Sequence, residues 1–399
     1  MKKALLGTTA IVGASLLAAN PVAAKPVVNI GGAMDFQVGW TSQDREGWSP
    51  TPGGTIGPST ERGYSFFQKT NILINASDVT DLGMKWDFRV KLNADADGGP
   101  GASNGLKNGK ARDASDAVTL ALSDFWGQVT VGADHPVYDR MTYGSGDAVG
   151  AAGTGGVDGN WARWFNYRSI KGQRFEDGAT THDSTTSSKI QYVTPRIAGF
   201  QAGVTYALDS LTIGRFRSAV DNAGNAAGNE MDWWSGALTY NNKFGGFDVG
   251  LSADLETNGN NDPARKRGLS GSFGTVVGID SWKFGARWSK KFRDGETLST
   301  DSNTAFDMYD LGVGYEIGPW ALGVSYMHEN EGSMALGNGN DSGTDTQDTW
   351  ALSGTYSMGG GLQLYTELFH NKDKAGGPTA PVASNNEGTG LISGVRVKF

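Results

Sequence analysis

Residues 84–93 have the sequence Met-Lys-Trp-Asp-Phe-Arg-Val-Lys-Leu-Asn, in which apolar and polar side chains alternate without a break. The even-numbered positions carry Met, Trp, Phe, Val and Leu, and the odd-numbered positions carry Lys, Asp, Arg, Lys and Asn. Successive side chains of a strand point to opposite faces of a sheet, so this period of two predicts a β-strand with one apolar and one charged face.

The same alternation recurs along the chain and predicts sixteen strands. They cover residues 27–41, 63–77, 83–93, 115–123, 126–133, 186–194, 198–208, 231–243, 245–256, 267–278, 280–291, 305–317, 319–330, 345–358, 361–371 and 388–399. Long loops rich in Gly, Asn, Asp, Ser and Thr alternate with short turns between these strands. In an up-and-down antiparallel sheet, all the long loops then lie at one end and all the turns at the other.

The composition agrees with a sheet that has a polar face in contact with water and an apolar face on the other side. Of 399 residues, 60 are Gly, 12 are Trp and 12 are Tyr, yet only 38% are hydrophobic. A membrane barrel needs an apolar stripe toward lipid and a polar stripe toward a water-filled lumen, which explains a mean hydropathy of −0.37. We therefore predict an all-β fold, a transmembrane 16-stranded antiparallel up-and-down β-barrel.

The N-terminal residues predict export. Lys2 and Lys3 precede an apolar, alanine-rich segment, and Val22-Ala23-Ala24 fits a small-residue cleavage site. We predict a signal peptide over residues 1–24 and a barrel over residues 25–399. The apolar segment is too short and too rich in alanine to favour a membrane anchor.

The sequence argues against catalysis and against nucleic acid as a partner. Cysteine is absent, and none of the four histidines has a Gly-x-Ser-x-Gly or His-Glu-x-x-His neighbour. A formal net charge of −8 disfavours binding to nucleic acid. We expect no enzyme and no required cofactor. The acidic loops leave Ca²⁺ binding open, although no stretch fits an EF-hand.

Three local patterns carry a family resemblance. Residues 116–132 form a strand–turn–strand pattern, residues 192–200 read Tyr-Val-Thr-Pro-Arg-Ile-Ala-Gly-Phe, and residues 394–399 read Gly-Val-Arg-Val-Lys-Phe. The first resembles the hairpin before the constriction loop of the trimeric general-diffusion porins of Gram-negative bacteria. The second resembles the hairpin after that loop, and the third resembles the closing strand of outer-membrane barrels. The resemblance implies an outer-membrane porin, a homotrimer, and passive diffusion of small hydrophilic solutes and ions.

The third long connection, residues 134–185, is the outlier in length, and so long a loop in a compact domain needs a reason. The resemblance implies that this constriction loop folds into the lumen and narrows it. It carries Asp139 and Asp147. It also carries an aromatic–basic patch over residues 161–168, which we expect to pin the loop against the inner wall.

The alternation assigns charged side chains to the lumen. The predicted pore constriction sets basic wall residues against acidic loop residues, namely Lys69, Arg89, Lys91, Asp139 and Asp147. The further lumen-wall candidates are Lys85, Asp87, Lys283, Arg287 and Arg396. The lumen-facing acids also include Asp254, Asp310 and Glu367. Opposed charges across a narrow waist favour small polar solutes over apolar ones.

Other interpretations stay open at this point. A substrate-specific channel, for phosphate or a sugar, would use the same barrel, and the basic row Lys85, Arg89 and Lys91 is compatible with it. The acid excess in the long loops favours a weak preference for cations. The predicted partners are outer-membrane lipid or lipopolysaccharide and the barrel assembly machinery. That machinery would recognise the last strand and Phe399 by strand addition.

Overall fold

The structure is a computed structural model, and it describes most of the chain outside the long loops. The described residues are 26–44, 63–94, 115–158, 161, 164, 165, 187–209, 230–260, 267–293, 306–332, 344–374 and 386–399. The predicted signal peptide, residues 1–24, lies outside them. Among the described residues, no helix has the length and apolar character needed to cross a membrane.

The described residues form sixteen strands, as the sequence predicts, and every predicted boundary lies within four residues of the observed one. The strands are β1 (Val27–Asp44), β2 (Tyr64–Val79), β3 (Lys85–Asn93), β4 (Ser115–Asp124), β5 (Gly127–Ala133), β6 (Ser188–Val193), β7 (Phe200–Asp209), β8 (Glu230–Phe244), β9 (Phe247–Asn260), β10 (Gly268–Ile279), β11 (Trp282–Arg293), β12 (Phe306–Ile317), β13 (Trp320–Gly332), β14 (Thr344–Gly359), β15 (Leu362–Lys374) and β16 (Asn386–Lys398).

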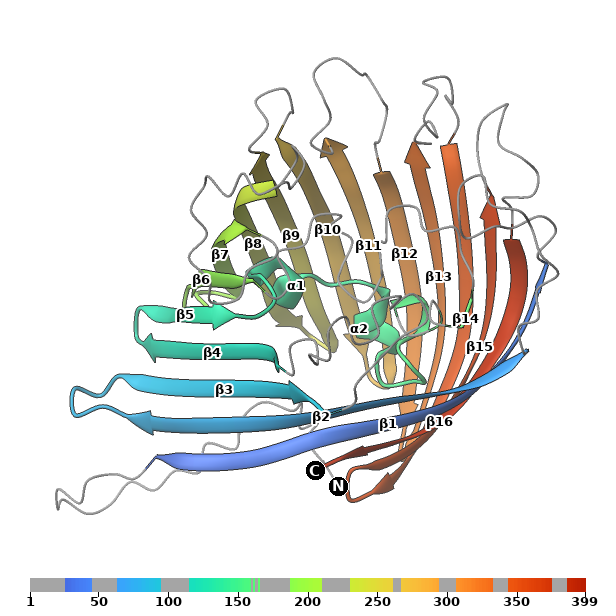
Figure 1. Cartoon of the computed structure of the whole chain (residues 1–399), viewed down its shortest axis with the longest axis horizontal. Coiled ribbons are helices and arrows are strands. Elements are labelled where there is room, and N and C mark those ends of the chain that lie inside the picture. The colour runs from blue at the N-terminus through green and yellow to red at the C-terminus, as the bar shows by residue number, and fades with distance from the viewer. Residues whose placement is uncertain are drawn as a thin grey trace, which may run out of the picture.

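Each strand pairs antiparallel with its neighbours in the chain, and β1 also pairs with β16, so the sheet closes into a barrel (Figure 1). Main-chain bonds extend this closure to the last residue. The amide of Gly32 donates to the carbonyl of Phe399 at 3.0 Å, and the amide of Phe399 donates back to Gly32 at 3.1 Å. The ring therefore has no unpaired edge strand.

Side chains on the two faces differ as the alternation predicts. On β13, Leu322 and Val324 face outward and are about half exposed, whereas Ser325 and Met327 face inward and are buried. Outward-facing aromatic pairs occur at two levels. Trp320 packs on Tyr356 near the short turns, and Tyr326 packs on Trp350 nearer the long loops. Aromatic side chains at two levels match the two membrane interfaces.

The wall is not equally tall all round. β3 to β6 have only 9, 10, 7 and 6 residues. β8 to β16 have 12 to 16 residues each. One side of the barrel is therefore a low wall.

A partly buried charge cluster joins the first strand to the last two. Arg396 donates to the Asp35 carboxylate from Nε at 3.1 Å and from its Nη2 at 2.9 Å. The Tyr365 hydroxyl donates to the other carboxylate oxygen, and the guanidinium stacks on the Tyr365 ring. Arg396, one of the predicted lumen-wall residues, is thus neutralised at the seam where the barrel closes.

Asp35→Asn should destabilise the barrel by about 1–3 kcal/mol, because the nearly buried Arg396 would lose the charge of its acceptor. The measurement is the urea concentration at which the folded form, which migrates faster on an unheated SDS gel, is lost. Asp248→Asn is the control. It breaks the Lys243–Asp248 pair, whose side chains are 80% and 61% exposed, so its effect should stay below about 1 kcal/mol. Equal losses in the two variants would contradict the role of the seam.

Candidate functional site

The described part of the third loop lies inside the ring of strands (Figure 1). It contains α1 (Val137–Met141), α2 (Ser145–Val149) and a 3₁₀ turn, η2 (Gly156–Asp158). α1 packs on β6 to β9, α2 packs on β10 to β13, and η2 packs on β13 and β14. The loop thus follows the inner wall of these strands rather than crossing the middle of the lumen.

Polar side chains of the wall hold the backbone of the loop. Five loop amides donate to wall oxygens: Val137 to Thr205 at 2.9 Å, Tyr143 to Ser252 at 2.8 Å, Ser145 to Asp310 at 2.6 Å, Gly153 to Thr355 at 2.7 Å and Val157 to Ser325 at 2.9 Å. Amides without helical partners need acceptors when they are buried. The wall supplies those acceptors from residues that lie 68 to 202 positions farther along the chain, so the path of the loop is specified only once the barrel has formed.

Three wall acids that the sequence assigns to the open lumen lie under the loop instead. Asp254 accepts from the Thr142 hydroxyl at 2.9 Å. Asp310 accepts from Ser145 and also from Nε of Arg287 at 2.7 Å. Glu367 is fully buried and accepts from the Thr154 hydroxyl at 2.7 Å. These acids act as anchors of the loop.

Arg287 faces inward, as predicted, but it does not line open lumen. Its side chain is 5% exposed and forms an ion pair with Asp310. Lys283, on the same strand, forms an ion pair with Glu316 at 2.7 Å, with about a third of each side chain exposed. With Arg396 bound to Asp35, three of the predicted basic wall residues are neutralised by acids on neighbouring strands.

The aromatic patch pins the loop, as predicted, at the three of its residues that the structure describes. Trp161, Trp164 and Phe165 are buried. They pack against inward-facing apolar side chains of β12, β13, β15 and β16, namely Met308, Met327, Phe369 and Ile392. Burial of large aromatic side chains is a strong apolar contribution, and it fixes the far end of the described loop.

The wall of β2 and β3 carries the other basic candidates. Lys69 lies on β2, and Lys85, Asp87, Arg89 and Lys91 lie on the inward face of β3. Among the described residues, no ion pair involves Lys69, Lys85 or Arg89, and the Nε of Arg89 has no hydrogen-bond partner. Lys69, Lys85 and Arg89 therefore carry positive charge that no ion pair neutralises within the described residues, and Asp87 lies between the last two on β3.

Strand register relates Arg89 to the loop. Arg89 is paired with Thr119 of β4, and Thr119 is paired with Gly132 of β5, two residues before the loop begins at Asp134. Arg89 therefore lies in the cross-strand row from which the loop departs. The loop then follows β6 to β14, and its aromatic end reaches Gln37 of β1 and packs near Phe67 of β2.

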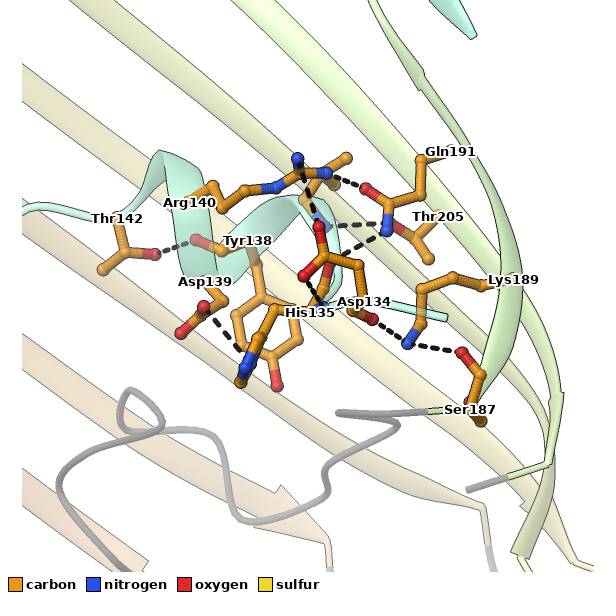
Figure 2. Close-up of polar contacts among 11 residues, drawn as sticks. Asp134, His135, Tyr138, Asp139, Arg140, Thr142, Ser187, Lys189, Gln191 and Thr205 are labelled. Carbon is orange, nitrogen blue, oxygen red and sulfur yellow. Dashed lines mark hydrogen bonds and ion pairs between the residues drawn. The ribbon is translucent and has the colours of Figure 1, made fainter. Parts of the chain in front are cut away.

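The lumen side of α1 carries charges of both signs (Figure 2). Asp139 lies 3.4 Å from the imidazole of His135, measured from Oδ2 to Nδ1. Arg140, which the sequence reasoning did not select, points the other way. Its guanidinium lies 3.8 Å from Asp134, bonds to Gln191 and leaves 40% of the side chain exposed. A lone arginine in a loop has no periodic signal that could have identified it.

Asp147 is the third residue of α2 and is exposed. Its carboxylate accepts from the Gly144 amide at 2.8 Å, which closes the first turn of the helix. The side chain borders the lumen, but the surrounding loop and wall desolvate the carboxyl, and this raises its pKa above the ordinary value against the Gly144 hydrogen bond. Asp139 and Asp147 are thus both at the loop surface, and the predicted constriction with Lys69, Arg89 and Lys91 stays a prediction.

The described residues contain no group of three or more His, Cys, Asp or Glu side chains that could hold a metal ion. Large parts of the acidic loops lie outside the described residues, so Ca²⁺ binding there stays a prediction.

Comparisons with known proteins agree with this architecture. A family model described as Gram-negative porin matches residues 7–376. Outer membrane porin protein 32 of Delftia acidovorans is 30% identical over 243 residues, which is 60% of this chain and 58% of that relative. The match thus spans less than two thirds of the relative.

Two solved structures share the fold. An anion-selective porin from Comamonas acidovorans is 18% identical, with a TM-score of 0.55 over 94% of this chain and 100% of that chain. The trimer form of OmpT, an outer membrane protein of Vibrio cholerae, is 11% identical, with a TM-score of 0.56 over 94% of this chain and 99% of that chain. At these identities the likeness shows the barrel fold alone.

Glu367→Ala should free the loop around η2, because the amides of Thr154 and Gly156 would lose their acceptor. Loss of a buried acceptor costs about 1–3 kcal/mol, so amide exchange at these two residues should accelerate roughly tenfold or more. Hydrogen exchange read by mass spectrometry measures this. Glu316→Ala is the matched control, since Glu316 faces inward but bonds to Lys283 rather than to the loop. Unchanged exchange in Glu367→Ala would contradict the anchoring role.

Proposed function

This chain belongs to the Gram-negative porin family, and we propose that it forms a water-filled channel for passive diffusion of small hydrophilic solutes and ions across the outer membrane. The observation that supports this most is the placement of the loop. It is bonded inside a closed barrel along β6 to β14, and the charged inward face of β3 belongs to another part of the same ring. Fold and family are those of a channel rather than of an enzyme.

The proposed waist of the channel lies between the β2–β3 wall and the loop. Lys69, Arg89 and Lys91 would supply positive charge from the wall, and Asp139 and Asp147 would supply negative charge from the loop. Fixed charges of opposite sign across a narrow passage orient dipolar solutes and water, which hinders apolar solutes. The neutralised pairs at Arg287 and Arg396 would contribute little to this field.

Charge at the waist favours anions. Lys69, Lys85 and Arg89 have no ion-pair partner among the described residues, whereas Asp139 has His135 beside it and Asp134 has Arg140. The acid excess in the outer loops acts from farther away, and salt screens charges beyond about 8–10 Å. Local charge should therefore outweigh the net charge of −8 and reverse the weak cation preference expected from composition. One relative of the same fold is described as anion-selective.

Conductance of the purified protein in a planar lipid bilayer tests the channel function. A diffusion channel should give current steps whose size rises linearly with salt concentration and does not saturate with any one solute. Small currents that saturate with phosphate or with one sugar would favour the alternative, a substrate-specific channel that uses the row Lys85, Arg89 and Lys91. Absence of current from a folded barrel would contradict both.

We propose that the chain forms a homotrimer, and the low wall supports this. β6 has 6 residues, about 20 Å along the strand, while the apolar band of an outer-membrane barrel is about 25 Å tall and its strands are tilted. Lipid alone would leave this side mismatched, so we propose that β3 to β6 are covered by neighbouring copies. A similar structure is described as a trimer form. Current steps that occur in groups of three would support the trimer.

We also propose lipopolysaccharide as a partner of the tall wall. Beyond the upper aromatic level, the outward-facing positions of β11 to β16 become ionisable: Lys290, Asp307, His328, Asp348, His370, Lys372, Lys374 and Glu387. Ionisable side chains are costly in hydrocarbon, so this ionisable band lies at headgroup level. Lys372 and Lys374 are adjacent outward positions on β15, and although Lys372 pairs with Glu387 at 2.5 Å, the two ammonium groups together suit a lipid phosphate.

The double variant Lys372→Gln with Lys374→Gln should retain less lipopolysaccharide through purification, because two phosphate-binding charges are lost. Phosphate analysis of the purified protein measures this. Lys243→Gln, at the opposite end of the barrel and 80% exposed, should retain the normal amount. Equal retention by all three proteins would contradict this use of the ionisable band.

For Phe399, which is 74% exposed at the end of β16, recognition by the barrel assembly machinery remains our proposal.

Arg89→Gln should shift ion selectivity toward cations. One unit charge acts on an ion roughly 7 Å away in water with about 0.6 kcal/mol, so the chloride-to-potassium permeability ratio should fall by a factor of about 3 or more. The reversal potential across a KCl gradient measures this ratio. Lys243→Gln again serves as the control and should leave the ratio unchanged. A ratio that Arg89→Gln does not alter would place Arg89 away from the waist.

A further inference from the structure

Four inward-facing glycines lie directly beneath the backbone of the loop, and we name them the glycine track. They belong to β10, β11 and β12. A Cβ built at each would meet a loop carbonyl oxygen: Gly274 that of Tyr143 at 1.9 Å, Gly285 that of Gly144 at 2.2 Å, Gly312 that of Ser145 at 2.8 Å and Gly314 that of Ala148 at 2.0 Å. Real Cβ atoms essentially never come closer than 3.0 Å to such an atom.

Space, and not backbone conformation, is what requires glycine at these positions. None of the four is among the glycines with positive φ, so their backbone conformation is open to any residue. On the same face of β10, a Cβ at Gly278 would lie 3.5 Å from the Cβ of Asp248, an ordinary contact. The requirement is therefore confined to the part of the wall that the loop covers.

The obstructing atoms could not yield easily. Each is a main-chain carbonyl oxygen, so relief of the clash requires movement of the loop backbone. At Gly203, by contrast, a Cβ would meet only side-chain atoms of the loop, the sulfur of Met141 at 2.8 Å and the Cβ of Val137 at 3.1 Å. Movement along the wall is opposed by the bonds from Tyr143 to Ser252 and from Ser145 to Asp310. The remaining direction is away from the wall, into the lumen.

We propose that the glycine track sets the distance between loop and wall, and that Gly274, Gly285, Gly312 and Gly314 thereby act as positioning residues that determine the width of the channel. This inference rests on the proposed diffusion channel. A methyl group at Gly274 or Gly314 lies 1.9 or 2.0 Å from a loop carbonyl oxygen and reaches an ordinary contact only at 3.4 Å, so it has to gain about 1.5 Å of separation from the loop. In a narrow waist that displacement excludes larger solutes more strongly than smaller ones.

The test compares Gly274→Ala and Gly314→Ala with Gly278→Ala, which is matched to the first in strand and face. Single-channel conductance and the swelling of protein-containing liposomes in a monosaccharide and in a disaccharide are measured for each. The track variants should conduct less than wild type. Their rate of disaccharide permeation should fall by a larger factor than their rate of monosaccharide permeation. Gly278→Ala should behave as wild type. Because the two sugars are uncharged, their permeation rates report the width of the passage and not its charge.

Three results would overturn the inference. Folded track variants could conduct and sieve like Gly278→Ala, which would mean that the loop does not move. They could conduct more than wild type, which would mean that the loop detaches from the wall and no longer narrows the channel. Ala variants at all four track positions could fail to fold while Gly278→Ala folds, which would make the track a folding requirement and not a spacer. Failure of the wild-type protein to conduct would instead refute the proposed channel function.

Discussion

Every backbone N–H and C=O group that enters the hydrocarbon of a membrane must find its partner within the protein. Twelve residue pairs between β1 and β16 complete this pairing and close the barrel, and the amides of Gly32 and Phe399 extend it to the end of the chain. Closure turns a local alternation of side chains into two environments. The outer face becomes a lipid surface, and the inner face becomes a polar wall on which a second layer of structure can be built.

The loop obeys the same constraint inside the lumen. Its helices are too short to satisfy their own amides, and the wall supplies the missing acceptors through Ser252, Asp310 and Glu367. This attachment engages the acids of the tall wall, whereas Lys85 and Arg89 of β3 have no ion-pair partner among the described residues. The asymmetry of charge in the proposed waist is thus a consequence of how the loop is held. The side chains that hold the loop thereby determine which other charges act on a permeating ion in the proposed waist.

The sequence was sufficient for the barrel because its signal is local. The alternation in residues 84–93 identifies the apolar face and the polar face of one strand. The number and order of strands follow from repetition of that pattern. The pinning role of Trp161 and Trp164 was also predictable, since large aromatic side chains in a long polar loop need burial. Lumen charges were harder. Periodicity gives the face of Arg287 and Glu367 correctly, but it cannot show that a loop more than 100 residues away in the chain covers them.

The proposed waist can be tested most directly by thiol modification, because the chain has no cysteine of its own. Arg89→Cys and Val90→Cys place a single thiol on adjacent residues of β3, one facing inward and one facing outward. A bulky, membrane-impermeant thiol reagent should lower the conductance of the Arg89→Cys channel stepwise and leave the Val90→Cys channel unchanged. Equal effects at the two positions, or none at residue 89, would contradict a waist between the β2–β3 wall and the loop.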